Sequence, residues 1–158
     1  MLPQGASQDS RDCEFCRIAR GEEEALVVCE SDDCLAFFPT EPATRGHTLI
    51  IPRQHAPDLW HIPLQLEASL MNMVVRVGQA LQRALHPDGM NLISSAGEAA
   101  EQTVFHLHLH VVPRWSGDRI GTIWPPKKPW NETVKEDVAD LVRAECAAGI
   151  DPTGPALR

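Results

Sequence analysis

No apolar run in the sequence approaches the ~18 residues that a helix needs to span a bilayer, so we expect no transmembrane segment and no membrane partner. Residues 1–12 are polar and lack the hydrophobic stretch of a secretory signal, which predicts a disordered tail and a cytoplasmic rather than a secreted protein. Basic residues are in the minority, because 14 Lys and Arg stand against 22 Asp and Glu, for a formal net charge of −8. That balance disfavours binding to DNA or RNA, which needs a basic face.

Five cysteines without a secretory signal indicate a reducing compartment, where thiols stay free or bind metal rather than pair as disulfides. Cys13 and Cys16 have two residues between them, which is the spacing of one of the two ligand pairs in many structural zinc sites. The pair is also compatible with two buried free thiols, or with an all-cysteine cluster that includes Cys29 and Cys34. Cys29 and Cys34 interrupt apolar strand patterns, however, and fit better as small core residues.

The chain of 158 residues is long enough for one domain, and its patterns predict an α+β fold with a mostly antiparallel sheet, one long helix and a short N-terminal helix. The predicted strands are Ala25–Cys29, Cys34–Phe38, Gly46–Ile51, Met90–Ser94 and Val104–Val112. The predicted helices are Cys13–Arg20, a long one from Pro63 to His86, and an amphipathic one that ends near Gly149. We therefore divide the chain into a tail over 1–12, a domain over 13–125, and a C-terminal linker and helix extension over 126–158.

The most informative segment runs from Phe105 to Arg114, where three histidines alternate with leucine. Alternation with period two predicts a strand that presents His106, His108 and His110 on one face, about 6.6 Å apart along the strand. Its other face is apolar and suits a core. A row of imidazoles can bind metal, bind phosphate, or supply a nucleophile.

This segment resembles the signature of the histidine triad family, a group of nucleotidyl hydrolases and transferases. The stretch from Gly46 to His55 is similar to the family's Gly-His-strand-Pro-basic-x-His block, and the stretch from Gly97 to Phe105 is similar to the loop before the triad. Three blocks in the family's order are more specific than one short motif. The resemblance implies a histidine-triad-like fold that usually pairs its sheets into a homodimer.

The resemblance also implies covalent catalysis at the α-phosphorus of a small nucleotide. His108 matches the nucleophile, which forms a nucleotidyl-histidine intermediate before water or another acceptor removes the nucleotide. His110 matches the residue that hydrogen-bonds the phosphate or the bridging oxygen, and we expect a backbone carbonyl on the neighbouring strand to hold the far N–H of His108. The implied activity is a nucleotidyl hydrolase or transferase that cleaves a phosphoanhydride, phosphoester or phosphoramidate without an organic cofactor.

Further positions match contacts of the family. The matched substrate-binding residues are His47, Ser95, Gln102 and Thr103, although a structural role for His47 stays equally open. Some branches of the family bind zinc through two cysteines and two histidines, and the matched ligands are Cys13, Cys16, His55 and His106. Such a site would pin the N-terminal helix to the sheet beside the triad.

Three departures from the family pattern concern the grip on the nucleotide. Pro39 stands where an Asp usually grips the ribose, Ser95 stands where an Asn often contacts phosphate, and Glu101 stands where a small Gly precedes Gln102. Glu41 is either a replacement ribose contact or a solvated loop residue. These departures leave a second hypothesis open, namely a nucleotide-binding or interaction module of the same fold with little turnover.

Overall fold

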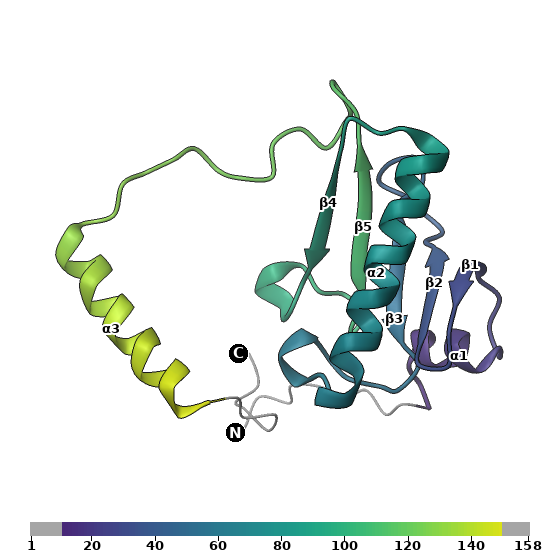
Figure 1. Cartoon of the computed structure of the whole chain (residues 1–158), viewed down its shortest axis with the longest axis horizontal. Helices are drawn as coiled ribbons and strands as arrows, with labels where there is room; N and C mark the ends of the chain where they lie inside the picture. Colours follow the sequence, from purple (N-terminus) through teal and green to yellow (C-terminus); the bar gives the residue numbers. More distant parts are fainter. Residues whose placement is uncertain (1–10, 150–158) are drawn as a thin grey trace.

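The structure is a computed structural model that describes residues 11–149. Its five strands form one antiparallel sheet in the order β1-β2-β3-β5-β4 (Figure 1). The strands are β1 (Leu26–Glu30), β2 (Cys34–Phe38), β3 (Thr48–Pro52), β4 (Gly89–Ser94) and β5 (Leu109–Arg114). The helices are α1 (Glu14–Arg20), α2 (Leu64–Leu85) and α3 (Glu132–Ala148), with short 3-10 turns at Leu59–His61 and Glu98–Ala100. The predicted α+β class is confirmed. The predicted disordered tail falls on residues outside the described part, apart from a turn at Arg11 and Asp12.

The helices begin and end where their capping residues indicate. α1 stops at Gly21, which takes the left-handed conformation (φ 73°) that glycine adopts at little cost, and its N–H bonds the carbonyls of Arg17 and Ile18. α2 follows Pro63 and ends at His86, where Pro87 prevents the helix from continuing. The long helix and the short N-terminal helix are therefore as predicted.

The strand predicted over Val104–Val112 is wrong at its start. β5 begins only at Leu109, since its pairing with β4 ends at Ser94 and Leu109 and its pairing with β3 ends at Ile50 and Leu109. The backbone groups before that point have other partners. The Leu107 N–H donates to the Ala56 carbonyl at 2.6 Å, and the Val104 carbonyl accepts from the Gln102 side chain at 3.1 Å. Two of the three triad histidines therefore lie in the loop that enters the strand.

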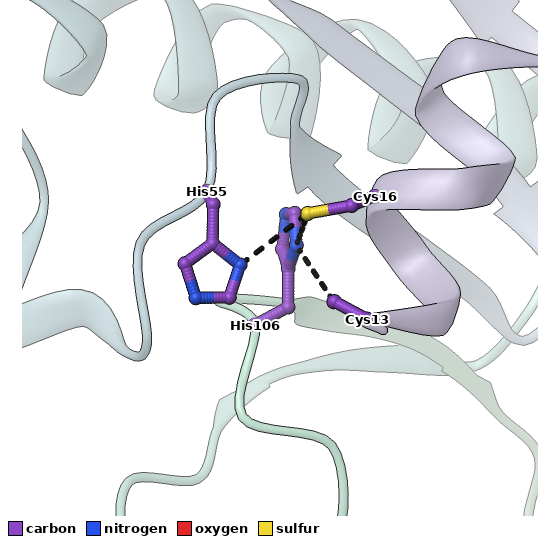
Figure 2. A group of neighbouring side chains, drawn as sticks. All are labelled: Cys13, Cys16, His55 and His106. Carbon is purple, nitrogen blue, oxygen red and sulfur yellow. Dashed lines mark hydrogen bonds between the residues drawn. The ribbon is translucent and has the colours of Figure 1, made fainter. Parts of the chain in front are cut away.

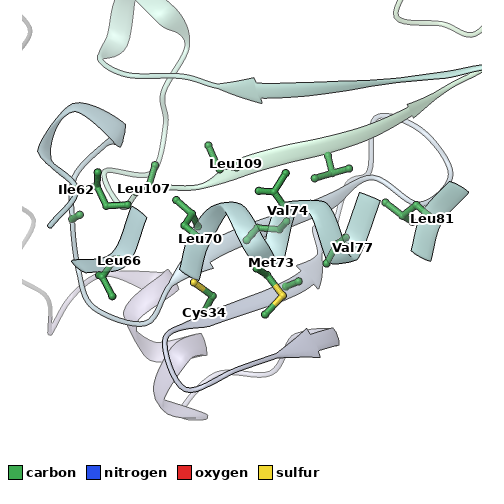
Figure 3. Packing of buried hydrophobic residues seen from close by; sticks show 14 residues of the cluster. Cys34, Ile62, Leu66, Leu70, Met73, Val74, Val77, Leu81, Leu107 and Leu109 are labelled. Atoms are coloured by element: carbon green, nitrogen blue, oxygen red, sulfur yellow. The ribbon is translucent and has the colours of Figure 1, made fainter. Parts of the chain in front are cut away.

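Two apolar clusters cover opposite faces of the sheet. The larger one packs β2, β3 and β5 against the inner face of α2, where Leu70, Met73 and Val77 are buried (Figure 3). The smaller one packs Phe15, Cys16 and neighbouring residues of α1 against the other face of β2 and β3. The apolar stripe of α2 is thus core, as predicted. The sheet separates a face devoted to stability from a face that carries α1.

The C-terminal helix stands apart from this domain (Figure 1). Asn131 caps α3 by accepting from the N–H groups of Thr133 and Val134, yet none of the residues of α3 is buried. The chain leaves β5 through a fixed corner, because Arg114 donates to Asp118, to Asn91 and to the Gly121 carbonyl. Pro125, Pro126 and Pro129 then pass outside the sheet, as predicted. Within residues 11–149, none of the helices is both long and apolar enough to cross a membrane.

Gly46 gives a test of how tightly the turn before β3 packs on the end of α2. It has φ 80°, and a Cβ there would collide with Leu85 and come within 3.2 Å of Leu81. We expect Gly46→Ala to lower the free energy of unfolding by about 1–2 kcal/mol for the left-handed backbone and by a further ~1–3 kcal/mol for overpacking. The measurement is urea denaturation.

Gly21→Ala is the matched control, because Gly21 has φ 73° and a Cβ added there would have no atom within 4 Å. It should show only the backbone part of the loss. Equal losses in the two variants would contradict the packing argument.

Candidate active site and metal centre

The three triad histidines lie on the α1 face of the sheet. Leu107, Leu109 and Val111, which alternate with the histidines, are buried in the cluster beneath α2. Side chains therefore alternate between the two faces of the sheet already at residues 106–108, before β5 begins. Phe105, expected on the same apolar face, is only partly buried and lies in neither cluster, because the chain bends at residues 104–106. The loop and the strand together present the imidazoles toward α1.

His108 has one ring nitrogen occupied and one free to react. Its Nδ1 lies 2.7 Å from the carbonyl oxygen of His106. A carbonyl only accepts, so Nδ1 carries the proton and Nε2 of the neutral ring keeps its lone pair. A backbone carbonyl does hold the far N–H, but the expectation that it comes from the neighbouring strand is wrong. It comes from two residues earlier in the same segment, because this part of the chain is bent rather than paired.

The surroundings of His108 keep it neutral. Its side chain is buried, and its ring packs against that of Phe15 in a T-shaped arrangement with ring centroids 5.2 Å apart. Burial lowers the pKa of His108, and the hydrogen bond to the His106 carbonyl partly opposes that shift. Neutral imidazole is the nucleophilic form. The contact with Phe15 was not foreseen from the sequence, where Phe15 shows only as an apolar residue of the first helix.

His47 and His110 form a second hydrogen-bonded unit beside His108. The Ala43 N–H donates to Nδ1 of His47 at 3.1 Å, so Nε2 of neutral His47 carries the proton and donates to Nδ1 of His110 at 2.9 Å. This leaves Nε2–H of His110 as the remaining donor of that ring. Burial, followed by repulsion from His108 and His47, lowers the pKa of His110 to about 4. His47 thus orients His110, and the backbone donor Ala43 has no sequence signal.

The remaining matched substrate positions are spread around the loop before β5. Ser95 directly follows Ser94, which pairs with Leu109 at the end of the ladder, just as His108 directly precedes Leu109. Thr103 is exposed. Gln102 is buried, with Oε1 accepting from the Gly97 N–H and Nε2 donating to the Pro57 and Val104 carbonyls. The Gln102 amide therefore holds the loop in shape, and its role toward substrate stays a prediction.

The residues that depart from the family pattern lie at the surface or near it. Pro39 directly follows β2 and is half-buried, whereas Glu41 is exposed in the next turn. Glu101 is exposed and has φ 64°, a left-handed conformation that favours glycine. A glycine in this place would thus suit the backbone as well as the phosphate.

Four metal-ligating side chains meet between α1, the loop after β3 and the triad (Figure 2). The donor atoms of Cys13, Cys16, His55 and His106 all lie within 4.8 Å of one another. Nδ1 of His106 is 3.4 Å from both sulfurs, and Nδ1 of His55 is 3.4 Å from Sγ of Cys16. Tetrahedral zinc with ordinary Zn–S and Zn–N bonds would set such sulfur–nitrogen separations at about 3.5 Å. The geometry fits a closed structural zinc site.

The protonation chemistry of these side chains fits a cation as well. The Pro52 carbonyl accepts from Nε2 of His106 at 2.9 Å, which leaves the Nδ1 lone pair directed at the thiols. Burial lowers the pKa of His106 to about 4, so the ring is neutral. Burial, then the hydrogen bond and charge of Cys13, raise the pKa of the Cys16 thiol to about 11. Two thiolates can share this buried site when a cation compensates their charge.

The alternative all-cysteine cluster is not formed. Cys34 lies in the cluster beneath α2, with Cys29 packed against it, whereas Cys13 and Cys16 lie in the cluster on the opposite face of the sheet. The interpretation of Cys29 and Cys34 as small core residues is confirmed.

A family model described as the HIT domain matches residues 20–117, well over half of the chain. The chain belongs to the histidine triad family. Proteins of this family bind nucleotides, and hydrolases occur among them, including the adenylylsulfatase HINT3 of Arabidopsis thaliana. That enzyme is 36% identical over 126 residues, which are 80% of this chain but only 62% of the plant protein. Protein hit of Bacillus subtilis is 34% identical over 73% of this chain and 80% of its own length.

Solved structures agree with the fold. A crystal structure of a Streptococcus mutans protein, 34% identical, aligns over 92% of this chain and 90% of that one with a TM-score of 0.80. A zinc-bound histidine triad family protein from Mycobacterium smegmatis is 37% identical and aligns over 87% of this chain and 99% of that one, with a TM-score of 0.66. Bound zinc therefore occurs in a relative of this histidine triad protein.

The metal centre gives a prediction about composition and stability. We expect close to one zinc per chain in protein purified without chelator, measured by inductively coupled plasma mass spectrometry. Cys16→Ser should lose most of this zinc and lower the free energy of unfolding by about 3 kcal/mol, the stabilisation that a ligand gives at roughly a hundred times its Kd. Cys146→Ser, an exposed thiol in α3, is the control and should change neither quantity. Zinc-free wild-type protein would contradict the assignment.

The departures at Pro39 and Glu101 give a prediction about affinity. Pro39→Asp should tighten binding of adenosine monophosphate by about 1.5–3 kcal/mol, or roughly ten- to a hundredfold, and should leave a 2′,3′-dideoxy analogue almost unaffected. Glu101→Gly should improve both ligands, because it relieves repulsion at the phosphate rather than at the sugar. Isothermal titration of two variants with two ligands separates these effects. If neither substitution helps, another residue grips the ribose.

Proposed function

We propose that the protein is a nucleotidyl hydrolase or transferase that acts through a covalent nucleotidyl intermediate on His108. The observation that carries this proposal is the hydrogen bond from Nδ1–H of His108 to the His106 carbonyl, because this bond leaves Nε2 of His108 unprotonated. Position, protonation state and partial enclosure by Phe15 all suit a nucleophile. The proposed substrate is a small nucleotide with a phosphoanhydride, phosphoester or phosphoramidate bond at its α-phosphorus.

In the first step, Nε2 of His108 attacks the α-phosphorus. A phosphorus–nitrogen bond forms, and the bond to the leaving group breaks with its electron pair on the leaving group. The imidazole becomes positively charged, and the His106 carbonyl stabilises that charge through Nδ1–H. Nε2–H of His110, oriented by His47, donates to the phosphate or to the bridging oxygen. In the second step, water or another acceptor displaces His108 from phosphorus.

This mechanism gives a graded prediction for two histidines. His108→Ala should abolish formation of the intermediate and lower the rate by roughly 10⁴-fold or more. His110→Ala keeps the nucleophile and loses one hydrogen-bond donor, so the rate should fall by roughly a hundred- to a thousandfold.

The measurement combines steady-state rates with intact-mass detection of the adduct. The panel contains adenylyl sulfate, nucleotide phosphoramidates and dinucleoside polyphosphates. A variant lacking His108 with near-native activity on the best substrate would overturn the mechanism. An equal loss in both variants would indicate that the roles of the two residues are exchanged.

A nucleotide-binding or interaction module with little turnover is the second candidate. It is favoured by Pro39 at the place of the ribose-binding carboxylate and by the Gln102 amide, which is bound to three backbone groups. The same panel discriminates the two, because a binding module would bind nucleotides without forming an adduct.

We also propose that the protein forms a homodimer in a reducing compartment such as the cytoplasm. β4 is an edge strand, and Leu92 on it is 49% exposed beside Met71 and Val75 of α2. A shallow hollow of about 320 Å³ lies there, lined by Leu70, Met71, Leu92 and other mostly apolar residues. α3 adds an exposed apolar stripe that includes Leu141. A second copy would cover these surfaces, and reducing conditions suit the free cysteines found in the described part.

Light scattering tests the dimer, which should have twice the chain mass of 17.4 kDa. Leu92→Glu should shift the mass toward the monomer, because it places a charge in the buried part of the interface. Leu26→Glu is the control, since Leu26 is 66% exposed on β1 at the opposite edge of the sheet. A monomeric wild-type protein, or equal effects of both substitutions, would contradict this interface.

A further inference from the structure

His106 belongs to two sites at once. Its imidazole takes part in the metal centre, with Nδ1 3.4 Å from the sulfurs of Cys13 and Cys16. Its backbone carbonyl accepts the hydrogen bond from Nδ1 of His108 at 2.7 Å. One fully buried residue therefore connects the cysteine-histidine cluster, through its imidazole, to His108, through the hydrogen bond that its own carbonyl accepts.

The sheet does not hold the His106 peptide in place. β5 begins three residues later, so the carbonyl of His106 is outside the ladder that fixes Leu109 and the residues after it. Two bonds hold this segment to β3 and to the loop after it, from Nε2 of His106 to the carbonyl of Pro52, the last residue of β3, and from the Leu107 N–H to the Ala56 carbonyl. The third restraint is the contact of Nδ1 with the two thiols of α1. The orientation of the carbonyl thus depends on what fixes the imidazole.

We propose that a zinc ion bound by Cys13, Cys16, His55 and His106 positions the nucleophile, with His106 as the connecting residue. A metal–nitrogen bond on Nδ1 holds the ring far more firmly than contact with a thiol does, and Nε2–H on the Pro52 carbonyl fixes its rotation. With the ring fixed, the backbone of residue 106 is held as well. Its carbonyl then keeps the proton on Nδ1 of His108, and the free Nε2 of His108 keeps one direction. Metal occupancy therefore controls the aim of the nucleophile in addition to stability.

This inference rests on the proposed function for its kinetic part, whereas the positioning itself is measurable without turnover. The probe is the proton on Nδ1 of His108. Because it is buried in a 2.7 Å hydrogen bond, it should exchange slowly with water and give its own signal in protein labelled with ¹⁵N-histidine. Long-range ¹⁵N–¹H spectra report which nitrogen of His108 carries the proton, and His108→Ala assigns the signal.

Matched substitutions at His55 separate positioning from folding. His55→Ala removes a ligand, whereas His55→Cys has a donor of similar reach and keeps a four-ligand zinc site of the Cys3His kind. Zinc-loaded wild type, chelator-treated wild type, both His55 variants and the distant control Cys146→Ser are compared at a temperature where circular dichroism shows each to be folded. Zinc content is measured on the same samples.

We expect the metal-free wild type and His55→Ala to lose or broaden the His108 signal. The rate of adduct formation should fall roughly tenfold to a hundredfold in these samples, with KM changed much less, because misplacement by about 1 Å has effects of this size. His55→Cys and Cys146→Ser should keep zinc, signal and rate.

A folded, metal-free protein that retains the His108 signal on the same nitrogen would overturn the proposal, whatever its stability. Loss of the rate with an unchanged signal would also overturn it. If the signal depends on zinc but no sample, zinc-loaded wild type included, forms an adduct, then the positioning link is upheld and the proposed function is the part that fails.

Discussion

The site depends on three fixed polar groups of one buried residue, His106. Nε2–H binds the Pro52 carbonyl at the end of β3, Nδ1 meets the two thiols of α1, and the backbone carbonyl accepts from His108. Each partner belongs to a different part of the chain. A buried residue whose two ring nitrogens and carbonyl all have partners keeps one orientation, because leaving any of these groups unpaired costs about 1–3 kcal/mol. The positions of α1, the loop and His108 follow from that orientation.

The two faces of the sheet have different contents, since the α2 face holds the larger apolar core and the α1 face holds the histidines. On one face, α2 packs an entirely apolar stripe on β2, β3 and β5, and this supplies most of the buried hydrophobic surface. On the other face, the short α1 leaves room for the histidines and packs Phe15 against them. Burial on that face lowers the pKa of His106, His108 and His110, so all three rings are neutral at neutral pH. Neutral imidazoles are what both a metal ligand and a nucleophile require.

The C-terminal arm, which consists of the segment from residue 125 and α3, is the part of the structure in which no residue is buried. A helix of this length is only marginally stable in water without tertiary contacts, and α3 has no buried residue within its own chain. The alignment with the Streptococcus mutans structure covers 92% of the chain, which is more than residues 1–124 can supply, so it extends into this arm. Apolar side chains therefore stay exposed on α3, as at Leu141, and on the edge strand β4, as at Leu92.

The sequence by itself determined the α+β class, the long core helix, the family, and the four cysteine and histidine side chains that meet in the metal centre. The class and the helix follow from periodicity, whereas the family and the four ligand positions follow from motifs that resemble those of the histidine triad family. Tertiary structure alone decided which nitrogen of each histidine is free, because the deciding partners are backbone groups of residues 43, 52 and 106, and a backbone group has no sequence signal. It also decided that β5 starts at Leu109, since the hydrogen bonds that end the predicted strand come from a loop fifty residues away.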